Sequence, residues 1–207
     1  MKLVFHYSAE NFTNTYVVGP EDGGDALLVD PGVFDVGLLE AIESNAFTVR
    51  WVLITRCQPA HVRGLRTLRK IYDAELYSRQ ADVLGFDCQL VKPGTHLHLG
   101  TFKIDCLCFP ELSHDTVVYK LGSWLFCGDL ISAGRPGKTT GPYAQANLAQ
   151  ALERRFFTWQ DELLVFPGEG PPTTLRSEKL FNLSRKVAGL EIQERPARPE
   201  SPGEAAH

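Results

Sequence analysis

The chain has 207 residues, of which 43% are hydrophobic and 22% are charged, and this composition is ordinary for one globular domain with a large core. The formal net charge is −4, and the sequence contains no Lys/Arg-rich run. The charge pattern therefore excludes an electrostatic surface for nucleic acid or for an anionic membrane.

The N-terminal sequence favours cytoplasmic residence. A single Lys precedes only Leu3-Val4-Phe5 before His6, and no apolar stretch reaches the roughly 18 residues that a membrane span needs. Five cysteines at irregular spacing, without C-x-x-C pairs, predict reduced thiols rather than a disulfide framework or a zinc ribbon.

The first half of the chain predicts the order strand, strand, helix, strand, loop, helix. A hairpin is expected from Thr15 to Asp30, because two apolar runs flank the breaker cluster Pro20-Glu-Asp-Gly-Gly-Asp25. Leu38, Leu39 and Ile42 recur at helical spacing, and Leu65, Leu68 and Ile71 do so again. Between the two helices, Trp51-Val52-Leu53-Ile54 is typical of a buried strand.

The second half predicts a further group of strands. They are expected at 75–77, 89–91, 102–109, 117–121, 124–127 and 163–166, with a polar loop at 133–142 and a helix at 144–156. Two groups of strands with interspersed helices predict an α/β (α+β) fold of four αββα layers, with two mixed sheets face to face. One domain over 1–189 and a disordered Pro/Glu/Ala-rich tail over 190–207 are expected.

The loop after the strand at 51–54 carries the main functional signal. It reads Thr55-Arg56-Cys57-Gln58-Pro59-Ala60-His61 and resembles the T-H-x-H-x-D-H loop of the metallo-β-lactamase superfamily. The two other His positions and the Asp position hold Arg56, Gln58 and Ala60, so His61 alone matches the metal-binding residues of that loop.

Further segments resemble the same superfamily in order, particularly its hydroxyacylglutathione-hydrolase-like (glyoxalase II type) members. They are Asn14–Val18 with the Asp30-Pro31-Gly32 turn, Glu111–Thr116 with His114, Leu125–Asp129, and Phe166–Thr174 with Glu169 at a His position. The resemblance covers nearly the whole chain before 190, and it implies the αββα sandwich.

By resemblance, the first metal of the dinuclear site would need ligands at positions 56, 58 and 114. The second metal would need ligands at positions 60, 61 and 169, and Asp129 would touch both metals. Such a pair activates a water molecule and polarises the attacked carbonyl. Guanidinium has no lone pair to donate and an amide is a poor zinc ligand, so the first metal is not expected. His61, Asp129 and Glu169, with His114, could hold one zinc, iron or manganese ion.

A metal-free alternative assigns Arg56 as a fixed cation that faces Asp129 and Glu169 in place of the first metal. Cys57 lies in the same loop, and two interpretations of it are open. A neighbouring cation could make it a reactive thiolate, or it could simply fill a tight loop. Solvated loop charges are the ordinary expectation for Arg135 and Lys138, although both could meet an anionic ligand.

Three hypotheses about function follow. The first is a protein that has lost dinuclear hydrolysis and keeps a polar cleft, including Arg56, Cys57 and Gln58, for a small ligand or a partner. The second is a mononuclear metal-dependent hydrolase of esters or thioesters, with His61 and Asp129 as its catalytic residues. The third is a non-catalytic assembly protein. The sequence specifies neither a substrate nor an oligomeric state.

Overall fold

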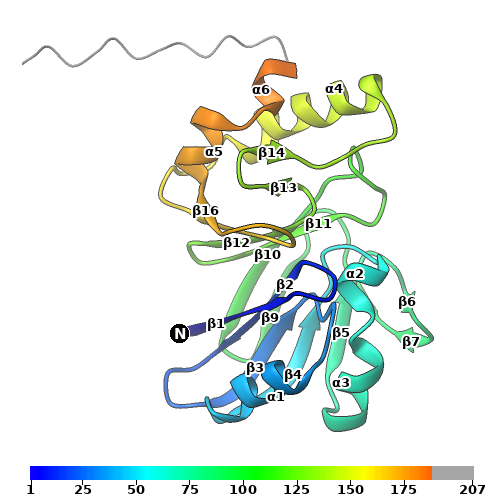
Figure 1. The fold of residues 1–207 in the computed structure, drawn as a ribbon, viewed down its shortest axis with the longest axis vertical. Coiled ribbons are helices and arrows are strands. Elements are labelled where there is room, and N and C mark those ends of the chain that lie inside the picture. Colours follow the sequence, from blue (N-terminus) through cyan, green and yellow to red (C-terminus); the bar gives the residue numbers. More distant parts are fainter. Residues whose placement is uncertain (188–207) are drawn as a thin grey trace, which may run out of the picture.

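The computed structural model describes residues 1–187, which form two six-stranded sheets packed face to face with helices on both outer sides (Figure 1). These four αββα layers confirm the predicted fold class. The domain end predicted at 189 and the tail predicted over 190–207 lie outside the described residues.

The first sheet contains antiparallel strands at one edge and parallel strands beyond them. Its strands, in spatial order, are β1 (Lys2–Ser8), β2 (Thr13–Gly19), β3 (Gly24–Val29), β4 (Phe47–Leu53), β5 (Glu75–Ser78) and β8 (Gln89–Leu90). The helices α1 (Val36–Glu43) and α3 (Leu65–Ile71) cover its outer face and bury Leu38 and Leu68 against it. Because β3, β4 and β5 are parallel, these helices serve as crossover connections.

The second sheet is also mixed, but most of its neighbouring strands are antiparallel. Its strands, in spatial order, are β16 (Thr173–Thr174), β15 (Leu164–Pro167), β12 (Trp124–Gly128), β11 (Val117–Leu121), β10 (Phe102–Cys108) and β9 (His96–Leu99). Its outer face packs against α4 (Pro142–Ala151), the π-helical segment η1 (Leu152–Phe156) and α5 (Leu175–Phe181). The remaining elements are α2 (Pro59–Val62), α6 (Ser184–Val187) and the hairpins β6 (Asp82–Val83) with β7 (Phe86–Asp87) and β13 (Ile131–Ser132) with β14 (Arg135–Pro136).

An aromatic cluster joins the two sheets. The ring centroid of Tyr16 lies 5.5 Å from that of Phe126 and 5.3 Å from that of Phe166, and Phe126 and Phe166 stack at 5.4 Å. Since a buried phenol needs a hydrogen-bond partner, the Tyr16 hydroxyl donates to the Pro167 carbonyl oxygen at 2.7 Å. The cluster therefore fixes β2 of one sheet against β12 and β15 of the other.

Most elements lie where the sequence predicts them, and the differences have local causes. The helix predicted at 144–156 begins earlier, at Pro142, where a proline suits the first helical turn, and its last turn widens into η1. The loop predicted at 133–142 includes the short strand β14, which pairs with β13. The strand β1 was not predicted.

None of the helices that the structure describes combines the length and the apolar composition needed to cross a membrane. All five cysteines are free thiols.

Candidate functional site: a carboxylate, imidazole and guanidinium chain

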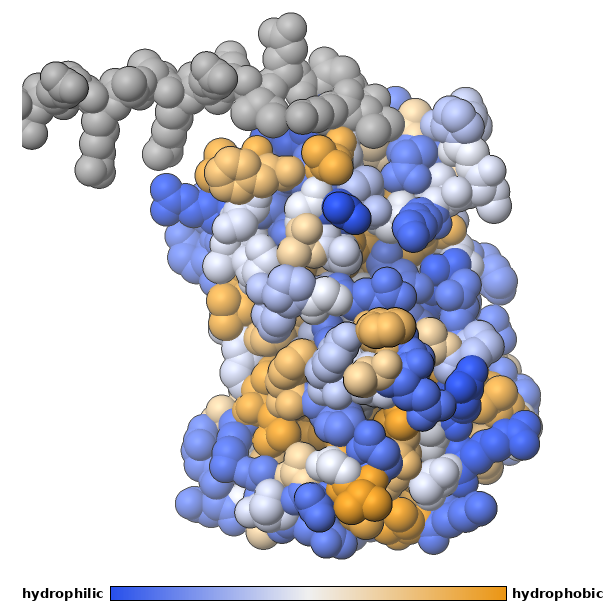
Figure 2. Space-filling view, viewed as in Figure 1, coloured by the Kyte–Doolittle hydropathy of each residue, from blue (hydrophilic) through white to orange (hydrophobic). Residues whose placement is uncertain are grey.

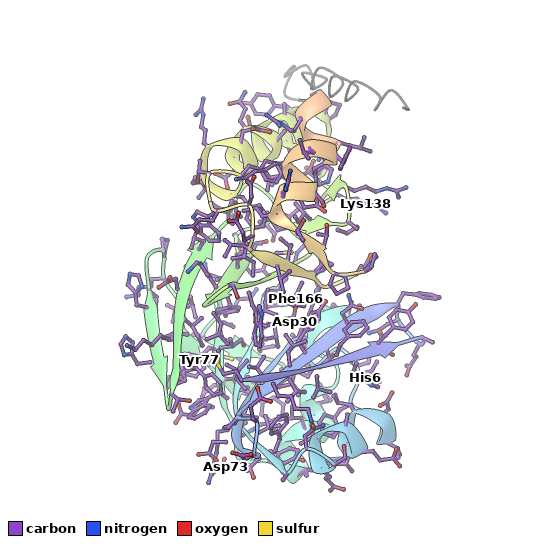
Figure 3. The ribbon with its side chains drawn as sticks, turned by 90° about the vertical axis from the view of Figure 1, so that its left-hand side faces the viewer. His6, Asp30, Asp73, Tyr77, Lys138 and Phe166 are labelled. Atoms are coloured by element: carbon purple, nitrogen blue, oxygen red, sulfur yellow. The ribbon has the colours of Figure 1, made fainter. Side chains whose placement is uncertain are left out.

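The loops that carry the predicted site residues meet at one end of the sandwich. Thr55–His61 follows β4, Asp129 follows β12, and Glu169 follows β15. Because carboxyl ends of neighbouring parallel strands meet at one edge, these loops converge there. In Figure 3, Asp30 lies between the two sheets, whereas Lys138 projects outward at the rim of the molecule.

Four charged side chains form a continuous chain at this point. His61 Nδ1 lies 3.0 Å from Asp30 Oδ2, and His61 Nε2 lies 2.9 Å from Asp129 Oδ1. On the far side of Asp129, Arg56 Nη1 donates to Oδ2 at 2.9 Å. The order is therefore Asp30, His61, Asp129 and Arg56, with the His61 side chain only 1% exposed.

The two carboxylates around His61 hold its ring in the protonated form. Burial alone would lower the pKa of His61, but the charge of Asp30 and the hydrogen bonds to Asp129 and Asp30 outweigh burial and raise the pKa to about 10. Burial would conversely raise the pKa of Asp129, but His61 and Arg56 lower it below its usual value. At neutral pH both ring nitrogens of His61 therefore act as donors.

Asp30 anchors this chain of charges to the first sheet. Its Oδ1 accepts the Thr55 backbone N–H at 2.8 Å, and its Oδ2 accepts the Thr55 hydroxyl at 2.6 Å. Asp30 has a φ of 52°, a left-handed conformation that Asp tolerates better than most residues do. It thus fixes the start of the site loop and the orientation of His61 together.

The glycines around His61 leave little room for the ring to move. A Cβ atom at Gly168 would lie 2.7 Å from His61 Cε1, and one at Gly32 would lie 2.0 Å from the Ala60 carbonyl oxygen. Gly168 therefore permits close packing between loops of the two sheets, and Gly32 permits close packing between two loops of the first sheet.

The structure brings Arg56 to Asp129 as the sequence predicts, but it does not bring Arg56 to Glu169. The Arg56 side chain is 16% exposed, and within residues 1–187 it forms no ion pair with Glu169. Its buried Nε also lacks a hydrogen-bond partner among the described residues. Arg56 is therefore a fixed cation with one donor left unsatisfied.

Three other predicted site residues lie at the periphery. Gln58, His114 and Glu169 are all exposed, whereas His61 is buried. Gln58 and Glu169 line the same cleft as Arg56 and Asp129, and His114 is not among its lining residues. The sequence thus predicted that Gln58 and Glu169 lie at the cleft, but it did not predict the contacts that these residues make.

The donor set does not fit a metal centre in this arrangement. In the part of the chain that the structure describes, no three His, Cys, Asp or Glu side chains are grouped so that they could hold a metal ion. Of the predicted set, His61 and Asp129 are in direct contact, whereas no hydrogen bond or ion pair among the described residues joins Glu169 or His114 to them. Arg56 binds Asp129 Oδ2 and His61 Nε2 contacts Asp129 Oδ1, so both oxygens of this carboxylate are already engaged.

Cys57 packs in the site loop without a cation that would activate it. Burial raises the pKa of its thiol to about 11, and its backbone N–H donates to Asp115 Oδ2 at 2.8 Å. Its side chain packs against the hydrophobic cluster between the first sheet and its helices α1 and α3, and its sulfur lies 3.8 Å from the Ser78 hydroxyl. These contacts favour the interpretation that Cys57 fills space over the one that makes it a reactive thiolate.

We expect native Cys57 to react with iodoacetamide at about pH 8 at least about tenfold more slowly than the same cysteine in denaturant, because the thiolate is the reactive form. Peptide mapping by mass spectrometry, with a Cys57→Ser variant to assign the peptide, would measure both rates. Rapid labelling of Cys57 in the folded protein would instead indicate an activated thiol.

Two buried carboxylates that position the site were not singled out from the sequence. Asp115 accepts from the Cys57 backbone and from the Ser113 hydroxyl at 2.5 Å, so it ties the loop before β11 to the site loop. Glu178 is 1% exposed and accepts the Gly134 N–H at 3.0 Å, which fastens the β13–β14 hairpin to α5. The Ser-x-Asp pattern at 113–115 is a local sequence signal for the role of Asp115, whereas the sequence around Glu178 contains no such signal.

A polar cleft of about 420 Å³ opens beside Arg56 and Asp129. The segment 128–138 supplies most of its wall, including Ser132, Arg135 and Lys138. Arg135 and Lys138 are exposed and have no ion-pair partner among the described residues. The cleft therefore presents unpaired positive charge next to a site whose carboxylate Asp129 is already neutralised.

Two mixed sheets in an αββα sandwich, with polar loops gathered at one end, define the class of metallo-hydrolase-fold proteins. Comparison with known proteins agrees with this assignment. The family model "Metallo-beta-lactamase superfamily" matches residues 9–86, and the chain is similar to members of this superfamily in sequence and in structure.

Three relatives show how far the similarity extends. An uncharacterized protein of Treponema pallidum is 28% identical over 84% of this chain and 94% of its own length. A hydroxyacylglutathione hydrolase of Haemophilus ducreyi is 29% identical over 91% of this chain and 78% of its own length. The crystal structure of ETHE1 from Myxococcus xanthus superimposes with a TM-score of 0.78 at 26% identity, covering 91% of this chain and 85% of that one.

Proposed function

We propose that this protein uses its cleft to bind a small anionic molecule, such as a carboxylate or a phosphate ester, and does not carry out dinuclear metal hydrolysis. The observation that carries the proposal is the ion pair between Arg56 and Asp129, at 2.9 Å. A guanidinium stands where the superfamily resemblance would place a metal ligand, and it neutralises the carboxylate that would otherwise attract a cation.

The charge around the cleft supports an anionic ligand. Arg135 and Lys138 are unpaired within residues 1–187, and Arg56 retains a buried Nε donor without a partner. Glu169 is the carboxylate at the cleft that no described cation pairs with. A guanidinium binds carboxylates and phosphates through paired, charge-assisted hydrogen bonds, so these three cations suit a ligand of either chemistry.

The test is a thermal-shift series with small mono- and dicarboxylates and phosphate monoesters. A ligand at 100 times its dissociation constant should stabilise the protein by about 2.7 kcal/mol. We expect Arg135→Gln/Lys138→Gln to remove the shift. The matched control Arg66→Gln/Lys70→Gln changes the same charges on the exposed side of α3 and should keep it.

The hydrolase hypothesis predicts a different result. One relative is named a hydroxyacylglutathione hydrolase, and His61 and Asp129 occupy matching positions of the superfamily loops. Elemental analysis after incubation with zinc, iron or manganese separates the two hypotheses. About one ion per chain that disappears in His61→Ala and Asp129→Ala would overturn metal-free binding and favour a mononuclear hydrolase of esters or thioesters. If the protein took up no metal and no anion shifted its melting temperature, the results would favour an assembly role.

A further inference from the structure

The strand β1 forms one edge of the first sheet, and its outer side is open. It pairs with β2 in unbroken antiparallel register over its whole length, from Lys2 opposite Gly19 to Ser8 opposite Thr13. Within residues 1–187, no other strand and no loop backbone hydrogen-bonds to it. Alternate N–H and C=O groups along this edge are thus available to another chain.

The edge lacks the usual devices that keep strands apart. β1 contains no proline and no bulge, and Lys2 is its one permanently charged side chain. Seven regular residues also exceed the very short edge strands by which many sheets avoid pairing. A strand of this kind is a template for β-augmentation.

One face of β1 carries an apolar row made of Leu3, Phe5 and Tyr7, of which Leu3 is partly buried and the two aromatic residues are exposed. The row continues the interior face of the sheet, since Leu3 lies opposite the buried Val18 and Phe5 opposite the buried Tyr16. Phe5 is 46% exposed and Tyr7 is 48% exposed, so the second sheet does not cover them fully. Figure 2 shows apolar residues gathered along the course of β1 on this face.

We propose that β1 pairs with β1 of a second copy of this chain, antiparallel and about a two-fold axis at Phe5. This register places Phe5 opposite its own symmetry mate, Leu3 opposite Tyr7, Val4 opposite His6, and Lys2 opposite Ser8. No like charges face each other, and the apolar row becomes continuous across both copies. An interface of this kind is self-complementary, as a two-fold dimer requires.

The opposite face of the strand does not obstruct this pairing. His6 points to that face, where its ring bonds to Asp35 at the start of α1. Helix α1 therefore covers the outer face of the sheet and leaves the edge strand β1 free along its outer side (Figure 1). Because a single strand pair buries little area, the dimer is weak and depends on protein concentration.

Sedimentation equilibrium over a wide concentration range tests the proposal. The wild-type mass should rise from monomer towards dimer, while Phe5→Lys and Phe5→Glu should each remain monomeric because like charges then meet at the axis. An equimolar mixture of the two variants should form dimers again. The control Phe181→Lys alters an aromatic residue on α5 that is 69% exposed, and it should dimerise as the wild type does.

Several results would overturn the inference. They are a wild-type protein that stays monomeric at the highest concentration, single variants that dimerise as well as the wild type, and a mixture that fails to recover. Phe5 also contacts Tyr16 at 5.6 Å between ring centroids, so a variant could lose stability. Thermal unfolding of each variant controls for this, and recovery in the mixture cannot arise from misfolding. Slower amide exchange in β1 with rising wild-type concentration provides an independent measurement.

Discussion

Replacing Asp30 with alanine is expected to lower the free energy of unfolding by about 3–5 kcal/mol, the range for removing one partner from a buried charge network. The carboxylate is 3% exposed and accepts from the Thr55 backbone, the Thr55 hydroxyl and His61. Alanine would leave all three donors without this acceptor. It would also place a residue without a polar side chain at a φ of 52°. Chemical denaturation monitored by circular dichroism would measure the loss.

Two further variants make this test specific. Asp30→Asn retains an acceptor oxygen and suits the left-handed conformation, so it should cost less than alanine. Asp25→Ala removes an exposed carboxylate that pairs with Arg50 at 3.1 Å, and it should cost no more than about 1 kcal/mol. Equal losses in Asp30→Ala and Asp25→Ala would show that the network contributes little to stability.

Stability should decrease as pH rises through the neutral range. The unfolded chain releases the His61 proton near pH 6.5, whereas the folded protein retains it up to about pH 10. A raised histidine pKa contributes stability that is fully present below pH 6.5 and is lost as pH rises towards 10. The native state then holds one more proton than the unfolded state, which gives a slope of about −1.4 kcal/mol per pH unit.

The measurement belongs between about pH 6.5 and about pH 7.5, where few thiols of the unfolded chain are ionised. Over this interval we expect the free energy of unfolding to fall by roughly 1 kcal/mol. A His61→Gln variant should show a flatter profile, and a direct NMR titration should find the wild-type ring protonated throughout. A His61 ring that titrates near its ordinary pKa would contradict the arrangement with two carboxylates.

The sequence predicted the fold well because local patterns and chain order agree. The apolar run Trp51–Ile54, the turn at Asp30–Gly32 and the ordered loops leave few alternatives to the αββα sandwich. The strand β1 was missed because its Leu3-Val4-Phe5 run is short and the apolar Val4 interrupts the alternation of apolar and polar residues. An edge strand depends on its neighbour for its conformation, and spacing along the chain does not show that neighbour.

The site was predicted in part. Proximity of Arg56, His61 and Asp129 followed from the loop order, and the structure places them in contact. The contact between His61 and Asp30 did not follow, since the sequence indicated only that Asp30 lies in a turn with Pro31 and Gly32. Likewise, the exposure of His114 and Glu169 depends on loop paths that residue types alone do not determine. Contacts between loops are set by tertiary packing, and short motifs carry little information about them.

The polar end of the sandwich also fastens the two sheets together. Asn14 of β2 donates from its backbone to the Gly168 carbonyl and from its side chain to those of Pro167 and Gly170, and the Val117 backbone of β11 donates to Thr55. The sheets therefore cannot slide apart without first breaking bonds that hold the cleft loops. Opening of the cleft and separation of the two sheets therefore become one cooperative event. A molecule bound in the cleft would restrain the whole domain, because it would hold the loops that join the two sheets.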